Sequence, residues 1–470
     1  MEGLEISEVN YSRIVSENRY DSEYFKQIFL DVESYLNKKK HFKLGDKYKV
    51  TDGEHGSVVF QDSGIKYLTA ENIKKGYVDI SKIRFVGEDV DIKNARARVK
   101  IGDILISIKG TLGEIAIAEN WLLPANMNRD VAIIKPLKKE FSSEYVALFM
   151  MSEYGALQSL RGGSGGVQQM ITLERLRKFI IPYFSAGFSE AVKELYTTAN
   201  NSRIKSQQIY SQSENLLLET LGLNNFEPCK EAVNIKTFKE SFGSTGRLDA
   251  EYYQLKYEDY ITLIYSYSNG VEPLSSVCQI QDSNFNPLEK SEYKYIELSN
   301  IGKSGDVTGC TLGFGAELPT RARRRVNTND VIISSIEGSL DSCAVITENY
   351  DSALCSTGFY VLTSLKLNPE TLLVLFKSEP MQNILKKGCS GTILTAIGKA
   401  ELEKIPIPLI DVATQKSIQE KVKESSKLRL KSEQLLELAK TAVEKAIEEN
   451  EEAALSFIEN SLILLNEKSI

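Results

Sequence analysis

Two stretches of the chain place apolar residues at helical spacing over an unusual length. Residues 189–221 and 412–449 contain no Gly or Pro, and apolar residues recur every three or four positions among Gln, Ser, Lys and Glu. This pattern predicts two amphipathic helices with one apolar stripe each. A helix of about 35 residues is about 50 Å long, which exceeds the diameter of a small domain.

The apolar stripes of these helices must be covered. They can bury each other as an antiparallel coiled coil that holds two globular parts apart, or each helix can pack back on its own domain. Beyond Ile447, an acidic run and then Leu455, Phe457, Ile458 and Leu462 predict a further short helix. That helix would either dock a partner or return against the long helices.

Short runs of β type fill the rest of the chain. Lys49–Val50, Ser57–Phe60, Ile104–Ile108 and Val131–Ile134 are separated by Gly, Asp and Asn turns. Strands end near Pro182 and in the segment 405–408, where proline marks the boundary because it cannot continue a ladder. The sequence therefore predicts mixed α+β globules.

The sequence contains an internal duplication. Arg19–Phe25 returns 228 residues later as Arg247–Tyr253, and Gly102–Ser107 returns as Asn329–Ser334. A period this long predicts two complete homologous domains in pseudo-two-fold arrangement, joined by the two long antiparallel helices. The expected division is 1–184 for the first domain, 185–223 for the first long helix, 224–246 for a linker, 247–410 for the second domain, and 411–470 for the second long helix and a C-terminal tail.

Composition excludes several classes of protein. No apolar run reaches the length of a membrane span, so we expect a cytoplasmic protein without membrane partners. The six cysteines are scattered and only two histidines occur, which argues against disulfides, zinc and histidine-based catalysis. We find no cofactor loop of a methyltransferase, no P-loop and no nuclease motif, so we expect no cofactor and no catalytic residues.

Charge is uneven along the chain. The net charge is −7, yet the first repeat is net positive and the second net negative. Any surface that binds nucleic acid must therefore be local. Basic residues cluster at equivalent places in the two repeats, in the segments 93–100 and 321–325.

Several segments of the first repeat resemble the target-recognition domain of type I restriction-modification specificity subunits. They are Thr51–Gly56 with Gly64–Ile73, Gly102–Gly113, Asn126–Ile134 and the glycine-rich loop that precedes Leu173–Pro182. With the duplication and the long helices, the resemblance covers essentially the whole chain. The second repeat departs from it at Gln281–Asn284, which replaces the Asp-Gly-x-His segment.

The resemblance implies a non-catalytic subunit that recognises a bipartite DNA site. Each domain would enter the major groove over one half-site of double-stranded DNA, and the long helices would set the gap between half-sites. Two methyltransferase subunits would bind around the helices, and restriction subunits that combine translocase and nuclease would join for cleavage. The competing hypothesis is a symmetric protein-binding scaffold that never touches DNA.

Candidate DNA contacts follow from the need for cations against phosphates and for polar side chains against base edges. The predicted contacts are Lys93, Arg96, Arg98, Lys100, Lys109, Arg161, Gln168, Gln169, Arg321, Arg323, Arg324, Arg325 and Lys387. Arg161, Gln168 and Gln169 are expected in one loop, where a glutamine could pair with adenine. The alternatives are solvated basic turns for the two clusters and a flexible turn for the segment 161–169. His55 is either a further contact or a turn residue bonded to local backbone.

Overall fold

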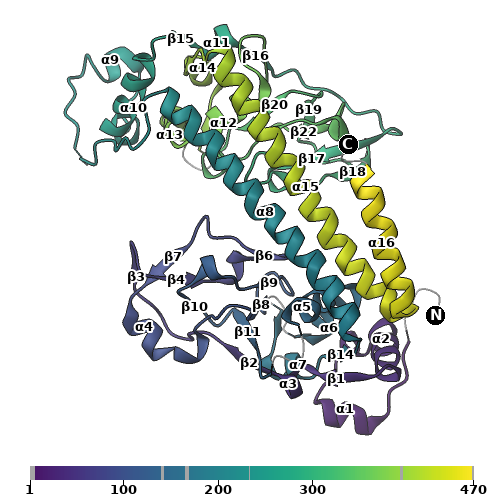
Figure 1. Cartoon of the computed structure of the whole chain (residues 1–470). Coiled ribbons are helices and arrows are strands. Elements are labelled where there is room, and N and C mark those ends of the chain that lie inside the picture. The colour runs from purple at the N-terminus through teal and green to yellow at the C-terminus, as the bar shows by residue number, and fades with distance from the viewer. Residues whose placement is uncertain (1–5, 139–141, 165–168, 232, 392–394, 468–470) are drawn as a thin grey trace. The chain divides into compact units, whose positions relative to one another are not determined.

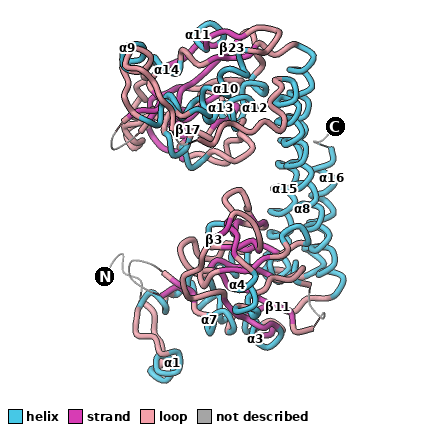
Figure 2. The backbone as a smooth tube through the Cα atoms, turned by 90° about the vertical axis from the view of Figure 1, so that its left-hand side faces the viewer, coloured by secondary structure: helices cyan, strands magenta, loops and turns pink. Residues whose placement is uncertain are grey.

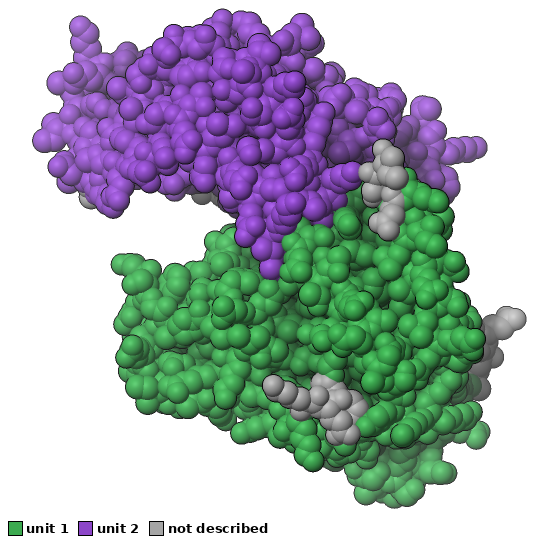
Figure 3. Space-filling view, viewed as in Figure 1, with its two compact units in different colours: residues 1–202, 430–470 green, residues 203–429 purple. Residues whose placement is uncertain are grey.

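The computed structural model describes residues 6–138, 142–164, 169–231, 233–391 and 395–467. The chain divides into two compact units (Figure 3). The first unit comprises residues 1–202 and 430–470, and the second comprises residues 203–429. Two long helices, α8 (Ala186–Thr220) and α15 (Val412–Glu448), each contribute to both units (Figure 1). The helices predicted from the apolar stripes are thereby confirmed.

The first unit is built on an antiparallel sheet that is buried on both faces. In order across the sheet, its strands are β2 (Tyr48–Asp52), β11 (Val131–Pro136), β8 (Ile104–Ser107) and β9 (Ile115–Ile117). Successive side chains of a strand point to opposite faces, so Ile104 and Ile106 enter one hydrophobic cluster and Leu105 another. Burial on both faces explains why these strands are continuous apolar runs in the sequence.

The first unit contains a second sheet of four strands. Its strands, in order, are β10 (Ala125–Met127), β4 (Ile65–Leu68), β7 (Arg84–Val86) and β3 (Phe60–Gln61). β10 and β4 are parallel, and the other pairs are antiparallel. The strand predicted over Ser57–Phe60 is wrong for its first three residues, because β3 begins only at Phe60.

The first unit contains further helices besides α8 and α15. They are α1 (Tyr11–Glu17), α2 (Gln27–Lys38), α3 (Leu44–Lys47), α4 (Glu88–Lys93), α5 (Ser143–Met151), α6 (Glu153–Gly162), α7 (Leu173–Arg177) and α16 (Glu451–Glu467). Ala454 and Ile458 of α16 lie in the same hydrophobic cluster as Phe188 of α8 and Leu435 of α15. The predicted helix beyond Ile447 thus returns against the first unit.

The second unit repeats both sheets. The antiparallel sheet has the order β16 (Cys278–Gln281), β23 (Phe359–Ser364), β20 (Val331–Ser334) and β21 (Cys343–Val345). The other sheet has the order β18 (Thr311–Phe314), β17 (Glu292–Ile296), β22 (Leu354–Ser356) and β19 (Ala322–Arg325). The parallel pair β17 and β22 corresponds to β4 and β10. The predicted α+β duplication is confirmed.

The two copies differ at the edges of the second sheet. The first copy adds β3 beside β7, whereas the second adds β19 beside β22. The segment of the first copy that corresponds to β19 is the 3-10 helix η3 (Ala95–Ala97). The helices of the second unit are α9 (Phe242–Thr245), α10 (Leu255–Tyr265), α11 (Leu274–Val277), α12 (Pro369–Lys377), α13 (Glu379–Gly388) and α14 (Lys399–Leu402).

Within the second unit, α8 and α15 run antiparallel and side by side (Figure 2). Lys205 lies 3.8 Å from Glu424, and Lys421 donates a hydrogen bond to Gln212 at 3.3 Å. The contacting residues thus advance along α8 as they go back along α15. Next to the contact of Lys205 with Glu424, the hydroxyl groups of Ser206 and Ser425 each donate to the other residue's carbonyl oxygen. The apolar stripes also join the core, since Leu217 and Val422 share its hydrophobic cluster. The antiparallel pairing predicted from the sequence is confirmed.

Pairs of short strands complete each unit. They are β1 (His41–Lys43) with β14 (Ile180–Pro182), β5 (Ile73–Lys74) with β6 (Tyr77–Val78), β12 (Gly163–Ser164) with β13 (Met170–Ile171), β15 (Val271–Pro273) with β26 (Pro406–Pro408), and β24 (Cys389–Ser390) with β25 (Ala396–Ile397). β14 ends at Pro182 and β26 ends at Pro408, as the sequence predicts. Two-stranded ladders tolerate proline because each strand has a free edge. No helix in the described part of the chain is long and apolar enough to cross a membrane.

Candidate nucleic-acid interface

The basic segment of the first unit lies beside strand β10. It consists of α4, η3 and the residues that follow to Lys100, and the Val99 N–H donates to the Ala125 carbonyl oxygen at 3.0 Å. The side chains of Lys93, Arg96 and Arg98 are exposed, as is Lys100. The structure therefore brings these four predicted residues together on one surface.

Three of these cations face carboxylates of their own unit. The Arg98 Nε donates to Asp91 at 2.7 Å, and the Lys93 Nζ lies 3.8 Å from a carboxylate oxygen of Glu54. The Arg96 guanidinium lies 3.4 Å from Asp52 and donates to the Gly53 carbonyl oxygen at 3.1 Å. Arg96 is thus engaged with the Asp52–Gly56 turn rather than standing alone in solvent.

The Asp52–Gly56 turn is held on several sides. The Glu54 N–H donates to the Met127 carbonyl oxygen at 3.0 Å, and the Arg129 N–H donates to the Glu54 carbonyl oxygen at 3.0 Å. The Glu54 carboxylate accepts hydrogen bonds from the Gly56 N–H and from the Asn94 amide, which hold its pKa below the usual value. The turn is therefore a fixed feature of the surface.

His55 lies at the exposed tip of this turn. Its Nε2 lies 2.8 Å from Oδ2 of Asp52, and 55% of its side chain is exposed, against 13% for Asp52. The sequence offered a local backbone contact as the alternative to a DNA contact. The structure shows a side-chain partner instead, with the imidazole facing outward.

The basic segment of the second unit occupies the equivalent place. β19 pairs with β22, the counterpart of β10, and the Val326 N–H donates to the Ala353 carbonyl oxygen at 3.0 Å. Arg321 and Arg325 are exposed, and the Arg325 guanidinium lies 5.3 Å from the centre of the Phe285 ring. The two predicted basic clusters therefore lie at equivalent positions, beside β10 in the first unit and beside β22 in the second.

The other two arginines of this segment are partly buried. The Arg323 Nε donates to the Thr320 carbonyl oxygen at 3.1 Å. Arg324 buries Nε and Nη1 without a hydrogen-bond partner in the described structure. Its charge lies near Asp282, whose pKa is lowered first by the hydrogen bond from Lys399 and also by Arg324. The four arginines therefore do not form one uniform exposed cluster.

Lys109 lines a shallow hollow in the first unit. The hollow has a volume of about 430 Å³, and its lining also includes Thr69, Arg84, Asn128 and Asp130. The Lys109 Nζ lies 3.9 Å from Asp130. Gly110, which follows, has a φ of +83°, a conformation that glycine adopts without a steric penalty.

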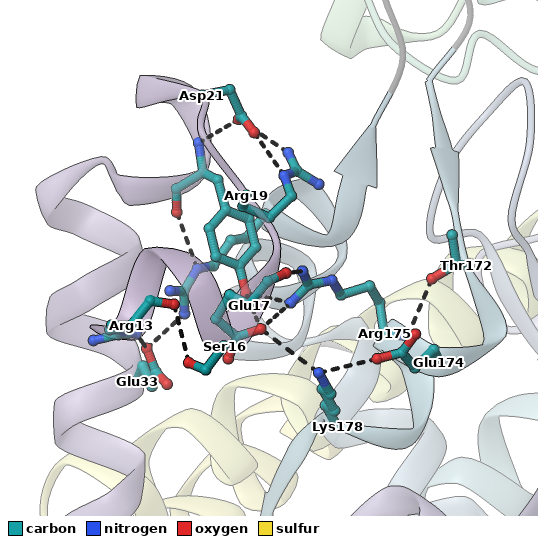
Figure 4. Close-up of polar contacts among 12 residues, drawn as sticks. Arg13, Ser16, Glu17, Arg19, Asp21, Glu33, Thr172, Glu174, Arg175 and Lys178 are labelled. Carbon is teal, nitrogen blue, oxygen red and sulfur yellow. Dashed lines mark hydrogen bonds and ion pairs between the residues drawn. The ribbon is translucent and has the colours of Figure 1, made fainter. Parts of the chain in front are cut away.

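Arg161 lies inside helix α6, so the expectation that it belongs to a loop is wrong. The helix continues through Gly162. The Arg161 guanidinium lies 4.4 Å from the centre of the Tyr24 ring and donates to the Tyr24 carbonyl oxygen at 3.1 Å and to Glu33 at 2.7 Å. Only 11% of its side chain is exposed. Figure 4 shows the neighbouring ion pairs of Arg13 with Glu33 and of Arg175 with Glu17.

Lys387 is the counterpart of Arg161 in the second unit. It lies in α13, with its Nζ 4.8 Å from the centre of the Tyr252 ring, and burial lowers its pKa. Both cations are thus engaged over a tyrosine of their own unit. Of the two predicted glutamines, Gln169 is exposed and Gln168 lies outside the described residues.

Sequence reasoning missed the residues that hold the turn. Asp52 and Glu54 contact Arg96 and Asn94 of the basic segment, which lie about 40 residues away in the sequence. The signal that could have revealed them is the coincidence of an acidic turn and a basic segment within one repeat. In the described part of the chain, no group of three or more His, Cys, Asp or Glu residues could hold a metal ion.

The geometry defines a duplicated protein that presents an equivalent basic segment beside the same strand in each unit. Residues 40–183 match the family model of the type I restriction modification DNA specificity domain. Over 119 residues the chain is 24% identical to the type I restriction enzyme EcoBI specificity subunit of Escherichia coli. That match spans 25% of this chain and 25% of the relative, so the chain covers a quarter of the relative's length. The first unit therefore contains a segment similar to the DNA specificity domain of type I restriction-modification systems.

Solved structures of similar proteins were also found. The S subunit of the type I restriction-modification system of M. genitalium has 12% sequence identity and a TM-score of 0.42, over 87% of this chain and 95% of that chain. The HsdS subunit of Thermoanaerobacter tengcongensis has 14% identity and a TM-score of 0.29, over 87% and 97%.

Proposed function

We propose that this chain is the non-catalytic DNA-specificity subunit of a type I restriction-modification complex, with each unit recognising one half of a bipartite site. The observation that carries the proposal is the repeated basic segment, which lies beside β10 in one unit and beside β22 in the other. The match of residues 40–183 to a DNA specificity domain supports the same function for the first unit. The duplicated fold extends it to the second.

The chemistry of the segments suits DNA. Exposed cations such as Lys100 and Arg321 can neutralise phosphates, which supplies affinity without reading sequence. Polar side chains on fixed turns can read base edges in the major groove. The chain is acidic overall, with a net charge of −7, so binding would be confined to these local surfaces.

Because the chain is duplicated, it would bind two methyltransferase subunits, one at each unit. Restriction subunits would join the same complex for cleavage. In this scheme the chain supplies sequence recognition, whereas the methyl transfer and the hydrolysis occur on its partners. A complex that acts on chromosomal DNA would work in the cytoplasm.

The direct test is to map modified bases in a host that expresses the partner methyltransferase with and without this chain. Single-molecule sequencing should show a two-part motif with a fixed gap only when the chain is present. No new methylation, with the methyltransferase expressed and bound, would favour the scaffold hypothesis. Steep weakening of binding to duplex DNA between about 50 and 200 mM salt would in turn exclude a scaffold that docks proteins through apolar helices.

The exposed arginines of the second unit give a second prediction. Replacing Arg321 and Arg325 with alanine should lower affinity for DNA and reduce the slope of log K against log salt by about 2, because two phosphate contacts are lost. Recognition of the other half-site should stay intact. The matched control is the pair Lys230→Ala and Lys404→Ala, two exposed lysines that each pair with a glutamate three residues before them. An equal loss with the control pair would contradict the assignment.

The long helices give a third prediction. We propose that they set the gap between the half-sites, so four residues inserted beside Gln207 should change the length of gap in the methylated motif. Four residues add about one helical turn. The control is an insertion of equal length in the linker 224–246. A motif with an unchanged gap and full methylation would refute the proposed role of the helices.

A further inference from the structure

We propose that His55 reads one base pair of the first half-site through an amino group in the major groove, and that Arg96 and Asp52 are its positioning residues. This inference rests on the proposed function and deepens it. It starts from the imidazole of His55, whose side chain is 55% exposed. This imidazole belongs to the Asp52–Gly56 turn, which is fixed by backbone hydrogen bonds to residues 127–129.

Asp52 determines which ring nitrogen of His55 carries the proton. An ionised carboxylate can only accept hydrogen bonds, so the Nε2 that lies 2.8 Å from Asp52 must be the donor. In the neutral imidazole, Nδ1 is then an acceptor. In the described structure Nδ1 has no partner, and more than half of the side chain is exposed. The turn therefore presents an acceptor to whatever docks against it.

Arg96 holds this arrangement from the basic segment. Its guanidinium lies 3.4 Å from the other carboxylate oxygen of Asp52 and donates to the Gly53 carbonyl oxygen at 3.1 Å. Asp52 thus bridges the arginine and the histidine, and the position of the imidazole depends on both. A cation with two such contacts at the base of the turn acts through His55 rather than on a phosphate.

The second unit provides an independent comparison. The strand registers place Ile280 opposite Leu362 as Val50 lies opposite Ile134. Asp282 therefore corresponds to Asp52, and the prediction that Gln281–Asn284 takes the place of the Asp-Gly-x-His segment is wrong by one residue. The charge of Arg324, an arginine of the equivalent basic segment, acts on Asp282. The residue at the position of His55 is Phe285, whose ring lies under Arg325. The aspartate and the arginine recur, but the imidazole acceptor belongs to the first unit.

An acceptor in the major groove selects an exocyclic amino group. Adenine N6 and cytosine N4 are the two such groups that face the major groove, and their strand and position distinguish the base pairs. His55 should therefore require an amino group at one defined place in the first half-site. The second half-site should carry no requirement that depends on His55.

The experiment combines variants of the chain with deletion of the amino group. The assembled complex with the methyltransferase is used with duplexes that contain the mapped motif. At the position affected by His55→Ala, purine replaces adenine or pyrimidin-2-one replaces cytosine, which removes the amino group. Removal should weaken binding by the wild-type complex about five- to tenfold, the worth of one hydrogen bond, and should leave binding by His55→Ala unchanged.

The positioning role has its own readout. Asp52→Asn and Arg96→Ala should also accept more than one base pair at that position, and adding Arg96→Ala to His55→Ala should relax the motif no further. Arg98→Ala is the matched control, because it removes an exposed cation of the same segment that pairs with Asp91. It should weaken binding at all sequences and keep the base requirement. In every variant, an unchanged second half-site and gap show that the chain is folded.

Two outcomes would overturn the inference. One is a motif that His55→Ala leaves intact, and the other is an amino-group deletion that weakens wild type and His55→Ala equally. Should His55→Ala abolish methylation, binding to the amine-deleted duplexes at low salt decides the question in the same way. A wild-type complex with no bipartite motif would refute the proposed function itself, which is a separate result.

Discussion

A Gly53→Ala substitution is expected to abolish recognition of the first half-site. A Cβ atom at this position would lie 1.9 Å from the Met127 carbonyl oxygen and 2.5 Å from that of Asn128. Both atoms belong to the backbone, so no side-chain rotation can relieve the overlap, and the turn that carries His55 must move. We expect a loss of about 3 kcal/mol in the free energy of unfolding of the first unit.

Urea unfolding and the methylation motif check this expectation together. The matched control is Gly338→Ala in the second unit, where a Cβ would meet nothing within 4 Å and the backbone is not left-handed. The control should keep the wild-type stability and motif. A Gly53→Ala variant with a wild-type urea midpoint and an unchanged first half-site would show that the turn tolerates displacement.

Arg161→Ala is expected to destabilise the first unit without changing the salt dependence of DNA binding. The substitution removes hydrogen bonds to Glu33 and to the Tyr24 carbonyl oxygen and the contact with the Tyr24 ring. Loss of a mostly buried, charged donor of this kind costs about 2 to 3 kcal/mol. This outcome would assign Arg161 to the core of the unit instead of to DNA.

Arg98→Ala should show the reverse pattern. Its side chain is 45% exposed, so the free energy of unfolding should change by less than about 0.5 kcal/mol, while the salt slope falls by about 1. Urea unfolding and salt titration of the same two variants separate the roles. A lower salt slope for Arg161→Ala at unchanged stability would restore the original prediction that Arg161 contacts phosphate.

The large features of the fold could be predicted because they repeat or extend over many residues. The helices over 189–221 and 412–449 follow from periodicity, and α8 and α15 occupy those segments almost to the residue. The duplication follows from a nearly constant shift. The strands β8 and β11 follow from apolar runs that are buried on both faces.

The side-chain partners could not be predicted, because they join distant parts of the chain. The glycines that follow Arg161 predict a loop, but Glu33 and Tyr24 hold Arg161 in α6. The charge of Arg96 predicts a phosphate contact. Its contacts with Asp52 and Gly53 depend on how η3 packs against the end of β2. Local sequence patterns do not predict such packing.

The return of the C-terminal helices to the first unit has a consequence for biosynthesis. Leu435, Ala439 and Ala442 of α15 and Ile458 of α16 lie in the same hydrophobic cluster as the strands formed by residues 104–134. A ribosome completes those strands long before residue 430 leaves its exit tunnel. The first unit can therefore complete its hydrophobic core only when nearly the whole polypeptide has been synthesised. Until then, part of that core stays exposed to solvent.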